Sequence, residues 1–220
     1  MSKVDYRLNA IVDGSLRGIG DLAELAAIAA GNGATIVQYR DKDASTRIMV
    51  ERAAAIRAAL ADSGVPLVVN DRIDVALAAC AEGVHLGRDD MDVTTARRLL
   101  GPDAIIGVTV KNAADADMAS DSPVDYACIG GVFETLSKRN PDAPVGIEGF
   151  AVLCKRIGAA RPDLPVGAIA GIDAGRAREV VTVGAMGVAV ISAIFRAVDI
   201  AMATRDLRRA VDEALKGRSS

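Results

Sequence analysis

Eight short apolar runs, each followed by a longer amphipathic stretch, constrain the fold of this chain most strongly. Runs this short and this continuously apolar are typical of parallel strands that are buried on both faces of a sheet. The predicted strands span 8–12, 34–38, 67–69, 83–86, 105–108, 126–129, 166–169 and 187–190. The predicted helices span 21–31, 44–62, 73–81, 93–100, 113–119, 148–160, 174–183 and 203–216. Eight β/α units in 220 residues predict an α/β protein, a single-domain (β/α)8 TIM barrel over residues 1–220.

A doubly wound open sheet is the alternative architecture. Such a sheet usually has fewer strands and a glycine-rich first turn of the form G-x-G-x-x-G. The turn at 13–20 contains glycines without that pattern, and no linker or domain break interrupts the chain. One connection is unusually long, since residues 130–147 follow the sixth strand without a clear periodicity. Loops of this length in compact domains often bind ligands or close over them.

Composition excludes several classes of partner. The net charge is −3 without a long Lys/Arg run, which argues against a nucleic-acid surface. No apolar stretch approaches the roughly 20 residues of a membrane helix, and the N-terminus lacks the apolar region of a secretory signal. Cys80, Cys128 and Cys154 are widely spaced and odd in number, which fits neither a disulfide framework nor a zinc site. We expect free, buried thiols, a cytoplasmic protein and no membrane or nucleic-acid partner.

The second predicted strand runs into a cluster of polar side chains. Gln38-Tyr39-Arg40-Asp41-Lys42 follows the apolar run directly. In an extended chain Tyr39 lies on one side, and Gln38 and Arg40 lie on the other. Arginine offers a planar fork to phosphate oxygens and lysine adds a compact charge, so the segment is suited to grip an anion. The alternative is a solvated strand end.

Other predicted strands also end in polar groups, and in a barrel of this kind the C-terminal strand ends form the active site. Asn70 and Asp71 follow the third strand, and His85 and Asp90 come from the fourth. Carboxylates among cations suit Mg²⁺, which shares substrate phosphate oxygens. The ends of strands seven and eight, near Gly171, are the usual phosphate-binding quarter of the fold. We therefore expect two phosphate-bearing ligands. Helix capping by Asn70 and Asp71 and a structural role for His85 stay open as alternatives.

These motifs, in this order, resemble the thiamine-phosphate synthase family over about residues 8–210. The family pattern Q-x-R-x-K matches residues 38–42, N-D matches Asn70-Asp71, and H-x-G-Q-x-D resembles residues 85–90. The loop pattern G-x-x-x-x-T-x-T-K resembles residues 130–138. G-G-I resembles residues 170–172, and V-x-S-A-I matches residues 190–194. Each motif is weak alone, whereas six in register on successive strand exits are specific.

The chain departs from the family pattern at several positions. Arg88 stands where the family usually has Gln, Thr109 where it has Ser, and Lys111 where it has His. The remaining departures are Glu134 for Pro, Ser137 for Thr and Ala170 for the first Gly of G-G-I. Thr109 and Ser137 keep a hydroxyl group, whereas Arg88 and Glu134 change the charge.

The resemblance implies an enzyme that couples hydroxymethylpyrimidine pyrophosphate to thiazole phosphate, giving thiamine phosphate and pyrophosphate in thiamine biosynthesis. It implies a Mg²⁺-assisted dissociative path, in which pyrophosphate leaves before the thiazole nitrogen attacks. The implied catalytic residues are Arg40, Lys42 and Lys138, and the implied Mg²⁺ ligands are Asp71 and Asp90. The implied contacts to the pyrimidine pyrophosphate are Gln38, Tyr39, Arg40, Asp41, Lys42, Asn70, Thr109 and Lys138. The implied contacts to the thiazole phosphate are Thr135, Leu136, Ser137, Gly171, Ile191 and Ser192.

Two other readings remain open. A Schiff-base aldolase would use Lys138 or Lys111 after strands six and five, and such a lysine needs a depressed pKa. A non-catalytic thiamine-phosphate-binding relative, or a protein like the thiazole tautomerases, would keep the pocket without the coupling reaction. The expected partners are small phosphorylated molecules, and a homo-oligomer is compatible with the sequence.

Overall fold

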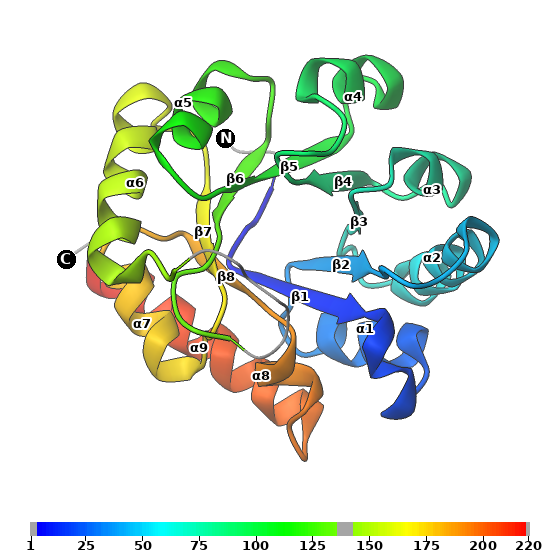
Figure 1. The fold of residues 1–220 in the computed structure, drawn as a ribbon. Coiled ribbons are helices and arrows are strands. Elements are labelled where there is room, and N and C mark those ends of the chain that lie inside the picture. Colours follow the sequence, from blue (N-terminus) through cyan, green and yellow to red (C-terminus); the bar gives the residue numbers. More distant parts are fainter. Residues whose placement is uncertain (1–3, 136–142, 219–220) are drawn as a thin grey trace.

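The computed structural model describes residues 4–135 and 143–218, in which eight parallel strands close into a barrel (Figure 1). The strands pair in chain order, and β8 returns to pair with β1. They are β1 (Leu8–Asp13), β2 (Ile36–Arg40), β3 (Leu67–Asn70), β4 (Gly83–Leu86), β5 (Ile105–Val110), β6 (Tyr126–Ile129), β7 (Val166–Ile169) and β8 (Gly187–Val190). The closed order confirms the predicted barrel and is incompatible with an open doubly wound sheet.

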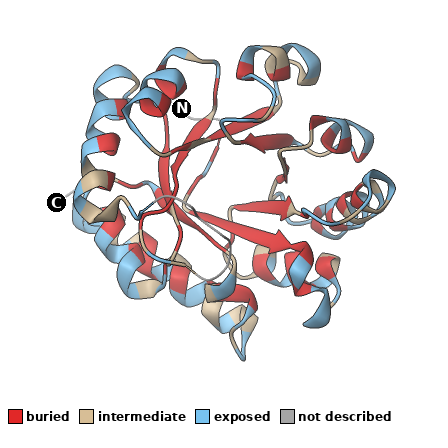
Figure 2. Cartoon of the chain, viewed as in Figure 1, coloured by how far each residue is buried: buried red, intermediate tan, exposed pale blue. Residues whose placement is uncertain are grey.

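Helices surround the barrel and cover its outer face (Figure 1). The described helices are η1 (Gly14–Gly18), α1 (Leu22–Gly31), α2 (Thr46–Leu60), α3 (Ile73–Ala78), α4 (Val93–Leu100), α5 (Ala113–Asp121), α6 (Gly146–Ala160), α7 (Ala174–Thr182), α8 (Ser192–Phe195) and α9 (Ile200–Arg218). Their inner faces are buried and their outer faces exposed (Figure 2). No helix within the described ranges is both long and apolar enough to cross a membrane.

The helix starts follow from local capping. Asp21, Asp92 and Asp173 each precede a helix and accept hydrogen bonds from backbone N–H groups of its first turn. Ser45 occupies the corresponding position before α2 without a side-chain capping bond. Helix α3 ends earlier than predicted, because Cys80 adopts a left-handed backbone conformation with φ 52°. The α7 and α9 helices pack together and close the ring next to β8.

Side chains alternate between two cores, because successive residues of a strand face opposite sides. The larger core lies between the barrel and the helices and includes Val37 and Tyr39. The smaller core fills the inside of the barrel and includes Ile36 and Val68. This alternation confirms that Tyr39 lies on the opposite side of β2 from Gln38 and Arg40.

Two tyrosine rings fill the lower part of the barrel. Tyr6 and Tyr126 are almost fully buried, and their ring centroids are 4.6 Å apart. Glycines on the neighbouring strands leave space for them, since a Cβ atom at Gly167 would overlap the Tyr6 ring and one at Gly107 would overlap the Tyr126 ring. The two rings therefore fill the interior below the pocket that opens at the C-terminal strand ends.

Several strands extend beyond their predicted ends. Strand β1 includes Asp13, β2 includes Arg40, β3 includes Asn70 and β5 includes Thr109. Polar residues after an apolar run usually indicate the start of a loop. At the mouth of this barrel the polar side chains face the interior, and the backbone keeps its hydrogen bonds to the neighbouring strands. These four polar residues therefore lie on the strands themselves.

The cysteine prediction is partly wrong. Cys128 and Cys154 are free and buried, as expected, whereas Cys80 is free and exposed at the end of α3. Burial raises the pKa of the Cys154 thiol to about 12, which keeps that group protonated and inert.

Candidate active site

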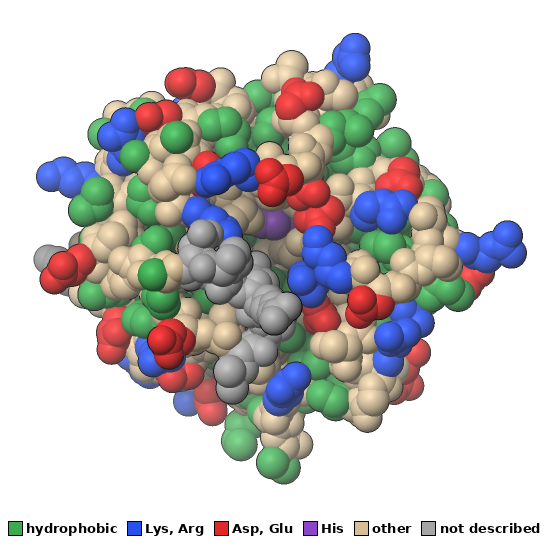
Figure 3. Space-filling view, in the orientation of Figure 1, with side chains coloured by type: hydrophobic (Ala, Val, Ile, Leu, Met, Phe, Trp, Pro, Cys, Tyr) green, Lys and Arg blue, Asp and Glu red, His purple; other side chains and the backbone are tan. Residues whose placement is uncertain are grey.

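A pocket opens at the C-terminal ends of the strands, where Figure 3 shows a hollow with the histidine at its base. Basic and acidic side chains lie along the same rim of the hollow (Figure 3). The lining residues come from all eight strands, from the loops after β6, β7 and β8, and from the start of α8. They are Ile11, Gln38, Arg40, Asn70, His85, Thr109, Cys128, Thr135, Ile169, Ala170, Gly171, Ile172, Ala189, Val190, Ile191, Ser192 and Ala193.

Two basic residues at the rim, Arg40 and Lys42, are each paired with a carboxylate. Arg40 donates a hydrogen bond to Asp13, its register partner on the neighbouring strand β1. Lys42 donates to Asp71, which follows β3. The Arg40 and Asp13 side chains are mostly buried, whereas the Lys42 side chain is 55% exposed. Positive and negative charges therefore alternate along this wall.

The two predicted metal ligands lie together. Burial raises the pKa of the Asp90 carboxyl, and the neighbouring Asp71 carboxylate raises it further. Asp90 accepts a hydrogen bond of 2.7 Å from the backbone N–H of Gly87, which fixes its carboxylate at the rim. Within the described ranges no cluster of three or more His, Cys, Asp or Glu side chains could hold a metal by protein ligands alone. Two carboxylates fit Mg²⁺, which completes its shell with water and substrate oxygens.

The exit of β3 resolves the capping alternative for Asn70 and Asp71. Helix α3 has Arg72 at its N-cap without any side-chain capping bond, so neither preceding residue caps it. Asn70 instead lines the pocket. Asp71 has a positive φ of 64°, an unusual conformation for a non-glycine residue that is most often tolerated by Asn and Asp. Strained backbone of this kind clusters at functional sites.

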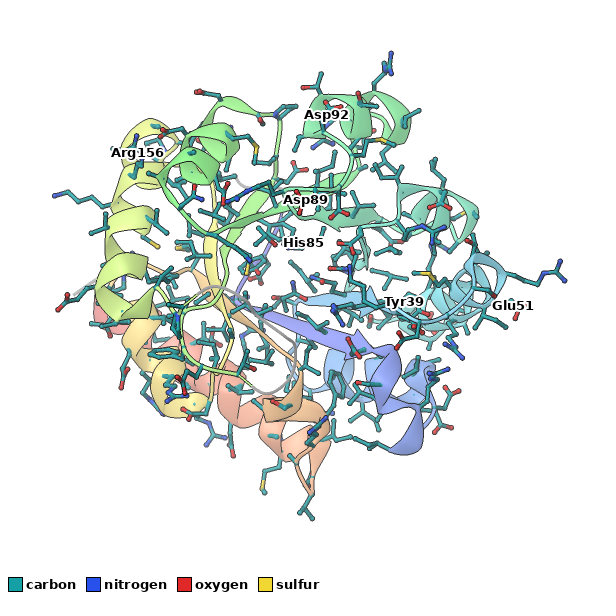
Figure 4. All side chains as sticks on the ribbon, in the orientation of Figure 1. Tyr39, Glu51, His85, Asp89, Asp92 and Arg156 are labelled. Atoms are coloured by element: carbon teal, nitrogen blue, oxygen red, sulfur yellow. The ribbon has the colours of Figure 1, made fainter. Side chains whose placement is uncertain are left out.

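Polar side chains lie inside the barrel at the base of the pocket. Gln38 is 3% exposed and His85 is 7% exposed. The Nε2 atom of His85 lies 2.9 Å from the Thr109 hydroxyl, and its Nδ1 atom lies 3.0 Å from the Tyr126 hydroxyl. Figure 4 shows His85 within the ring of strands. The only histidine of the chain thus joins the pocket to the buried tyrosines.

The opposite side of the pocket is formed by backbone. Gly171 has φ 64°, and a Cβ atom there would overlap the Glu134 carbonyl oxygen and lie 2.9 Å from the Phe133 Cβ. Glycine is therefore required where the β7 exit meets the loop after β6. Thr135, Ile191 and Ser192 complete this side.

The loop after β6 is anchored at both described ends. Phe133 donates its backbone N–H to the Ala170 carbonyl, and Gly146 donates to Val132. The Arg176 guanidinium lies 4.6 Å from the centroid of the Phe133 ring and donates to the Gly171 carbonyl at 2.7 Å. Three of the predicted site residues, Leu136, Ser137 and Lys138, lie outside the described residues.

Two predicted binding residues face away from the pocket. The Tyr39 side chain is fully buried between the barrel and the helices, toward α2 (Figure 4), and burial raises its pKa to about 12. Asp41 accepts hydrogen bonds from the Tyr39 hydroxyl, from Arg52 and from the N–H groups of residues 43 and 44. Although burial opposes it, these donors lower the pKa of Asp41. Both side chains hold the β2–α2 turn, so they support Arg40 and Lys42 rather than line the pocket.

Arg88 is held by a partner that its sequence neighbours did not reveal. Its guanidinium forms a fork on the Asp115 carboxylate of α5, with distances of 2.8 to 3.1 Å. Asp115 also accepts the backbone N–H of Lys111. No local motif indicates this pair, because Asp115 lies 27 residues away along the chain.

Sequence reasoning missed two residues of the site itself. Asp13 belongs to the turn region of the apolar pattern, and only the register of β1 with β2 places it opposite Arg40. Tyr126 begins a strand and reads as an ordinary core residue until the barrel closes around it. No local motif signals either contact, because both depend on strand pairing.

Comparisons with known proteins agree with this geometry. A family model described as thiamine monophosphate synthase matches residues 8–194. A thiamine-phosphate synthase of Agrobacterium fabrum is 66% identical over 218 residues and 99% of each chain. One from Chloroflexus aurantiacus is 43% identical over 209 residues and 94% of each chain.

Solved structures give the same result. A thiamine phosphate pyrophosphorylase from Pyrococcus furiosus superposes with a TM-score of 0.83 at 35% identity, covering 97% of this chain and 98% of that one. An orotidine 5'-phosphate decarboxylase from Pyrococcus horikoshii has a TM-score of 0.68 at 14% identity, a likeness of fold alone. The pocket, the motifs around it and these similarities together place the chain in the thiamine monophosphate synthase family.

Proposed function

We propose that this protein is a thiamine-phosphate synthase, a transferase that joins hydroxymethylpyrimidine pyrophosphate to thiazole phosphate. The observation that carries the proposal is the two-sided pocket. One wall alternates the cations Arg40 and Lys42 with the carboxylates Asp71 and Asp90. The other wall is a backbone surface around Gly171. Two phosphorylated substrates can approach each other across the polar base formed by Gln38, His85 and Thr109.

The wall of alternating charges suits a departing pyrophosphate. Negative charge grows on the leaving group as its bond to the pyrimidine methylene carbon breaks, and fixed cations stabilise that charge most in the transition state. Arg40 is already oriented by Asp13, and Lys42 by Asp71. When pyrophosphate binds, these cations exchange one anionic partner for another, so little reorganisation is required. Asn70 adds a neutral donor on the same wall.

The proposed reaction then needs no strong base at the reacting atoms. The carbon–oxygen bond breaks with its electron pair passing to pyrophosphate, which leaves a cation stabilised by the pyrimidine ring. The ring nitrogen of the thiazole donates its lone pair to form the new carbon–nitrogen bond. That nitrogen carries no proton, so none must be removed. This balance agrees with a chain that contains a single histidine.

The carboxylates Asp71 and Asp90 would hold a Mg²⁺ ion at this wall. A bound Mg²⁺ would neutralise charge on the pyrophosphate oxygens. The proximity of the two carboxylates supports this role, because it raises the Asp90 pKa and favours a divalent cation between them. Asp90 keeps its orientation through the N–H of Gly87.

The thiazole phosphate would bind at the backbone side, near Thr135, Gly171, Ile191 and Ser192. Hydroxyl and backbone N–H groups can bind phosphate oxygens without adding charge. Placing the two anionic groups on opposite sides of the pocket keeps their mutual repulsion low. The loop that carries Leu136, Ser137 and Lys138 starts and ends beside this wall, and we propose that Lys138 adds a third cation to the pyrophosphate.

The alternatives lack a matching feature among the described residues. Of the two lysines that a Schiff base could use, Lys111 is not among the residues lining the pocket and Lys138 lies outside the described residues. A non-catalytic binding protein would not need the paired cations and carboxylates of the first wall. The decisive experiment incubates the protein with both substrates and Mg²⁺ and follows thiamine phosphate by chromatography. EDTA should stop the reaction and Mg²⁺ restore it, whereas binding of both substrates without product would favour the non-catalytic alternative.

A further inference from the structure

Below the pocket, a line of hydrogen bonds runs from the barrel interior to Thr109. The Tyr126 hydroxyl lies 3.0 Å from Nδ1 of His85, and Nε2 of His85 lies 2.9 Å from the Thr109 hydroxyl. The Tyr126 and His85 rings are also stacked, with centroids 5.6 Å apart. Tyr126 is fully buried, whereas Thr109 lines the pocket. The line therefore connects an inaccessible phenol to a side chain that can touch a ligand.

The direction of these bonds follows from the hydrogen-bonding needs of Tyr126. Burial raises the pKa of its phenol far above the ordinary value, so the group keeps its O–H. In the described structure, His85 Nδ1 is the only hydrogen-bond partner of that hydroxyl. Leaving a buried O–H without an acceptor costs about 1 to 3 kcal/mol. The phenol therefore donates to Nδ1, and the imidazole carries its proton on Nε2.

The Nε2–H of His85 then donates to the Thr109 oxygen. When the Thr109 oxygen accepts this hydrogen bond, its own proton points in another direction. The pocket is the direction in which a ligand can accept that proton. The reverse direction would have Thr109 donate to Nε2 and present only an acceptor to the pocket. The same Thr109 side chain thus offers a donor or an acceptor according to the tautomer of one buried ring.

We propose that Tyr126 is a positioning residue that holds His85 in the Nε2–H tautomer, so that Thr109 presents a hydrogen-bond donor to the pocket. This rests on the proposed function, in which Thr109 contacts the pyrimidine substrate. It extends that function by naming what the contact selects, which is a ring with an unprotonated acceptor nitrogen at this point. Gln38, on the facing side of the base, supplies an amide with both donor and acceptor atoms.

The chain offers a matched control in Tyr6. Its ring lies 4.6 Å from that of Tyr126 in the same interior, and its hydroxyl is equally buried. Unlike Tyr126, the Tyr6 hydroxyl has no hydrogen-bond partner in the described structure. Tyr6→Phe and Tyr126→Phe therefore remove the same atom from the same core, but only the second interrupts the line to Thr109.

The test is nuclear magnetic resonance of protein labelled with ¹⁵N-histidine, which reports on His85 alone because the chain has one histidine. We expect the wild type and Tyr6→Phe to show a protonated Nε2 and an unprotonated Nδ1. Tyr126→Phe should shift the tautomer toward protonated Nδ1. A wild-type ring already protonated at Nδ1, or one unchanged in Tyr126→Phe, would overturn the proposal.

Kinetics provide a second readout. In Tyr126→Phe we expect kcat/KM for the pyrimidine pyrophosphate to fall about tenfold, while KM for thiazole phosphate stays constant. Tyr6→Phe should leave both kinetic constants unchanged. Equal losses of kcat/KM in Tyr6→Phe and Tyr126→Phe would indicate an effect of core packing and contradict the proposal. In a Thr109→Val background, Tyr126→Phe should cause no additional loss, and an additive loss would contradict the relay. If the wild type is inactive yet shows the expected tautomer, the proposed function fails while the hydrogen-bonding arrangement stands.

Discussion

Asp13 and Arg40 face each other in register on the neighbouring strands β1 and β2, and the aspartate orients the guanidinium toward the pocket. Asp13 also accepts the N–H of Ser15, which fixes its own position. A mostly buried guanidinium would be costly without a partner, and the pairing explains how it is retained. The pair is thus both a structural element and the start of the proposed anion-binding wall.

Arg40→Ala should lower kcat by at least about a hundredfold, because it removes fixed positive charge from the departing pyrophosphate. The steady-state rate of thiamine phosphate formation checks this. Arg156→Ala is the control, since Arg156 pairs with Asp117 on the outer surface (Figure 4) and should leave kcat unchanged. Arg40→Ala also leaves the Asp13 carboxylate without its arginine, which should lower the unfolding temperature. The double variant Asp13→Asn/Arg40→Ala should unfold at a higher temperature than Arg40→Ala and stay equally inactive. Wild-type turnover in Arg40→Ala would refute the assignment of this wall.

Asp90→Asn should raise stability and lower activity together. The native protein holds the Asp90 proton more tightly than the unfolded chain, so the free energy of unfolding falls as pH rises from the ordinary pKa through the raised one. The amide cannot ionise and avoids this loss, so the variant should unfold at a higher temperature than wild type at pH 7. This difference in unfolding temperature between Asp90→Asn and wild type should vanish at pH values below the ordinary pKa of an aspartate. Asn still offers an oxygen to the N–H of Gly87.

The same substitution should reduce turnover at least about tenfold at low Mg²⁺, with partial recovery at high Mg²⁺. Asp89→Asn is the matched control, because Asp89 is the exposed neighbour of Asp90. Calorimetry at several pH values and a Mg²⁺ titration of the rate provide the measurements. If Asp89→Asn and Asp90→Asn behave alike in the Mg²⁺ titration, the metal assignment is wrong.

Gly171→Ala should weaken use of thiazole phosphate. The new methyl group would meet the Glu134 carbonyl, and the backbone at φ 64° disfavours a side chain. We expect a raised KM for thiazole phosphate and a loss of stability of about 1 kcal/mol or more. Gly158→Ala is the control. Gly158 lies in α6 with open space around it, so alanine there should raise the free energy of unfolding by up to about 1 kcal/mol. An unchanged KM in Gly171→Ala would remove this wall from the thiazole phosphate site.

Arg88→Gln should change kcat by no more than about twofold. The Arg88 side chain is turned toward Asp115 on α5, and Asp115 keeps the Lys111 N–H as a partner after the change. Asp115→Ala should be more harmful, because it removes an acceptor that is 8% exposed and serves two donors. We expect a lower unfolding temperature in Asp115→Ala. A large rate increase in Arg88→Gln would instead mean that the arginine charge reaches the pocket.

The sequence predicted the architecture well because apolar periodicity is a local signal that eight repeats reinforce. It also predicted which face of β2 carries Gln38 and Arg40, since strand alternation is fixed by backbone geometry. It could not predict Asp13, Asp115 or Tyr126 as partners, because their contacts join strands and helices that are distant in the chain. The family motif also led to the prediction that Tyr39 and Asp41 contact the substrate. Their side chains instead stabilise the β2–α2 turn on the side away from the pocket.

The two tyrosine rings inside the barrel carry an evolutionary consequence. Tyr126 occupies the volume that a side chain at Gly107 would need, and Tyr6 occupies that of Gly167. Each glycine and its facing tyrosine therefore form a unit whose members lie on different strands or outside the sheet. A mutation that enlarges either glycine is tolerated only after its tyrosine has become smaller, so these positions must change in pairs. For Tyr126 such a pair exchange would also release His85, and the history of the pocket is thereby tied to the packing beneath it.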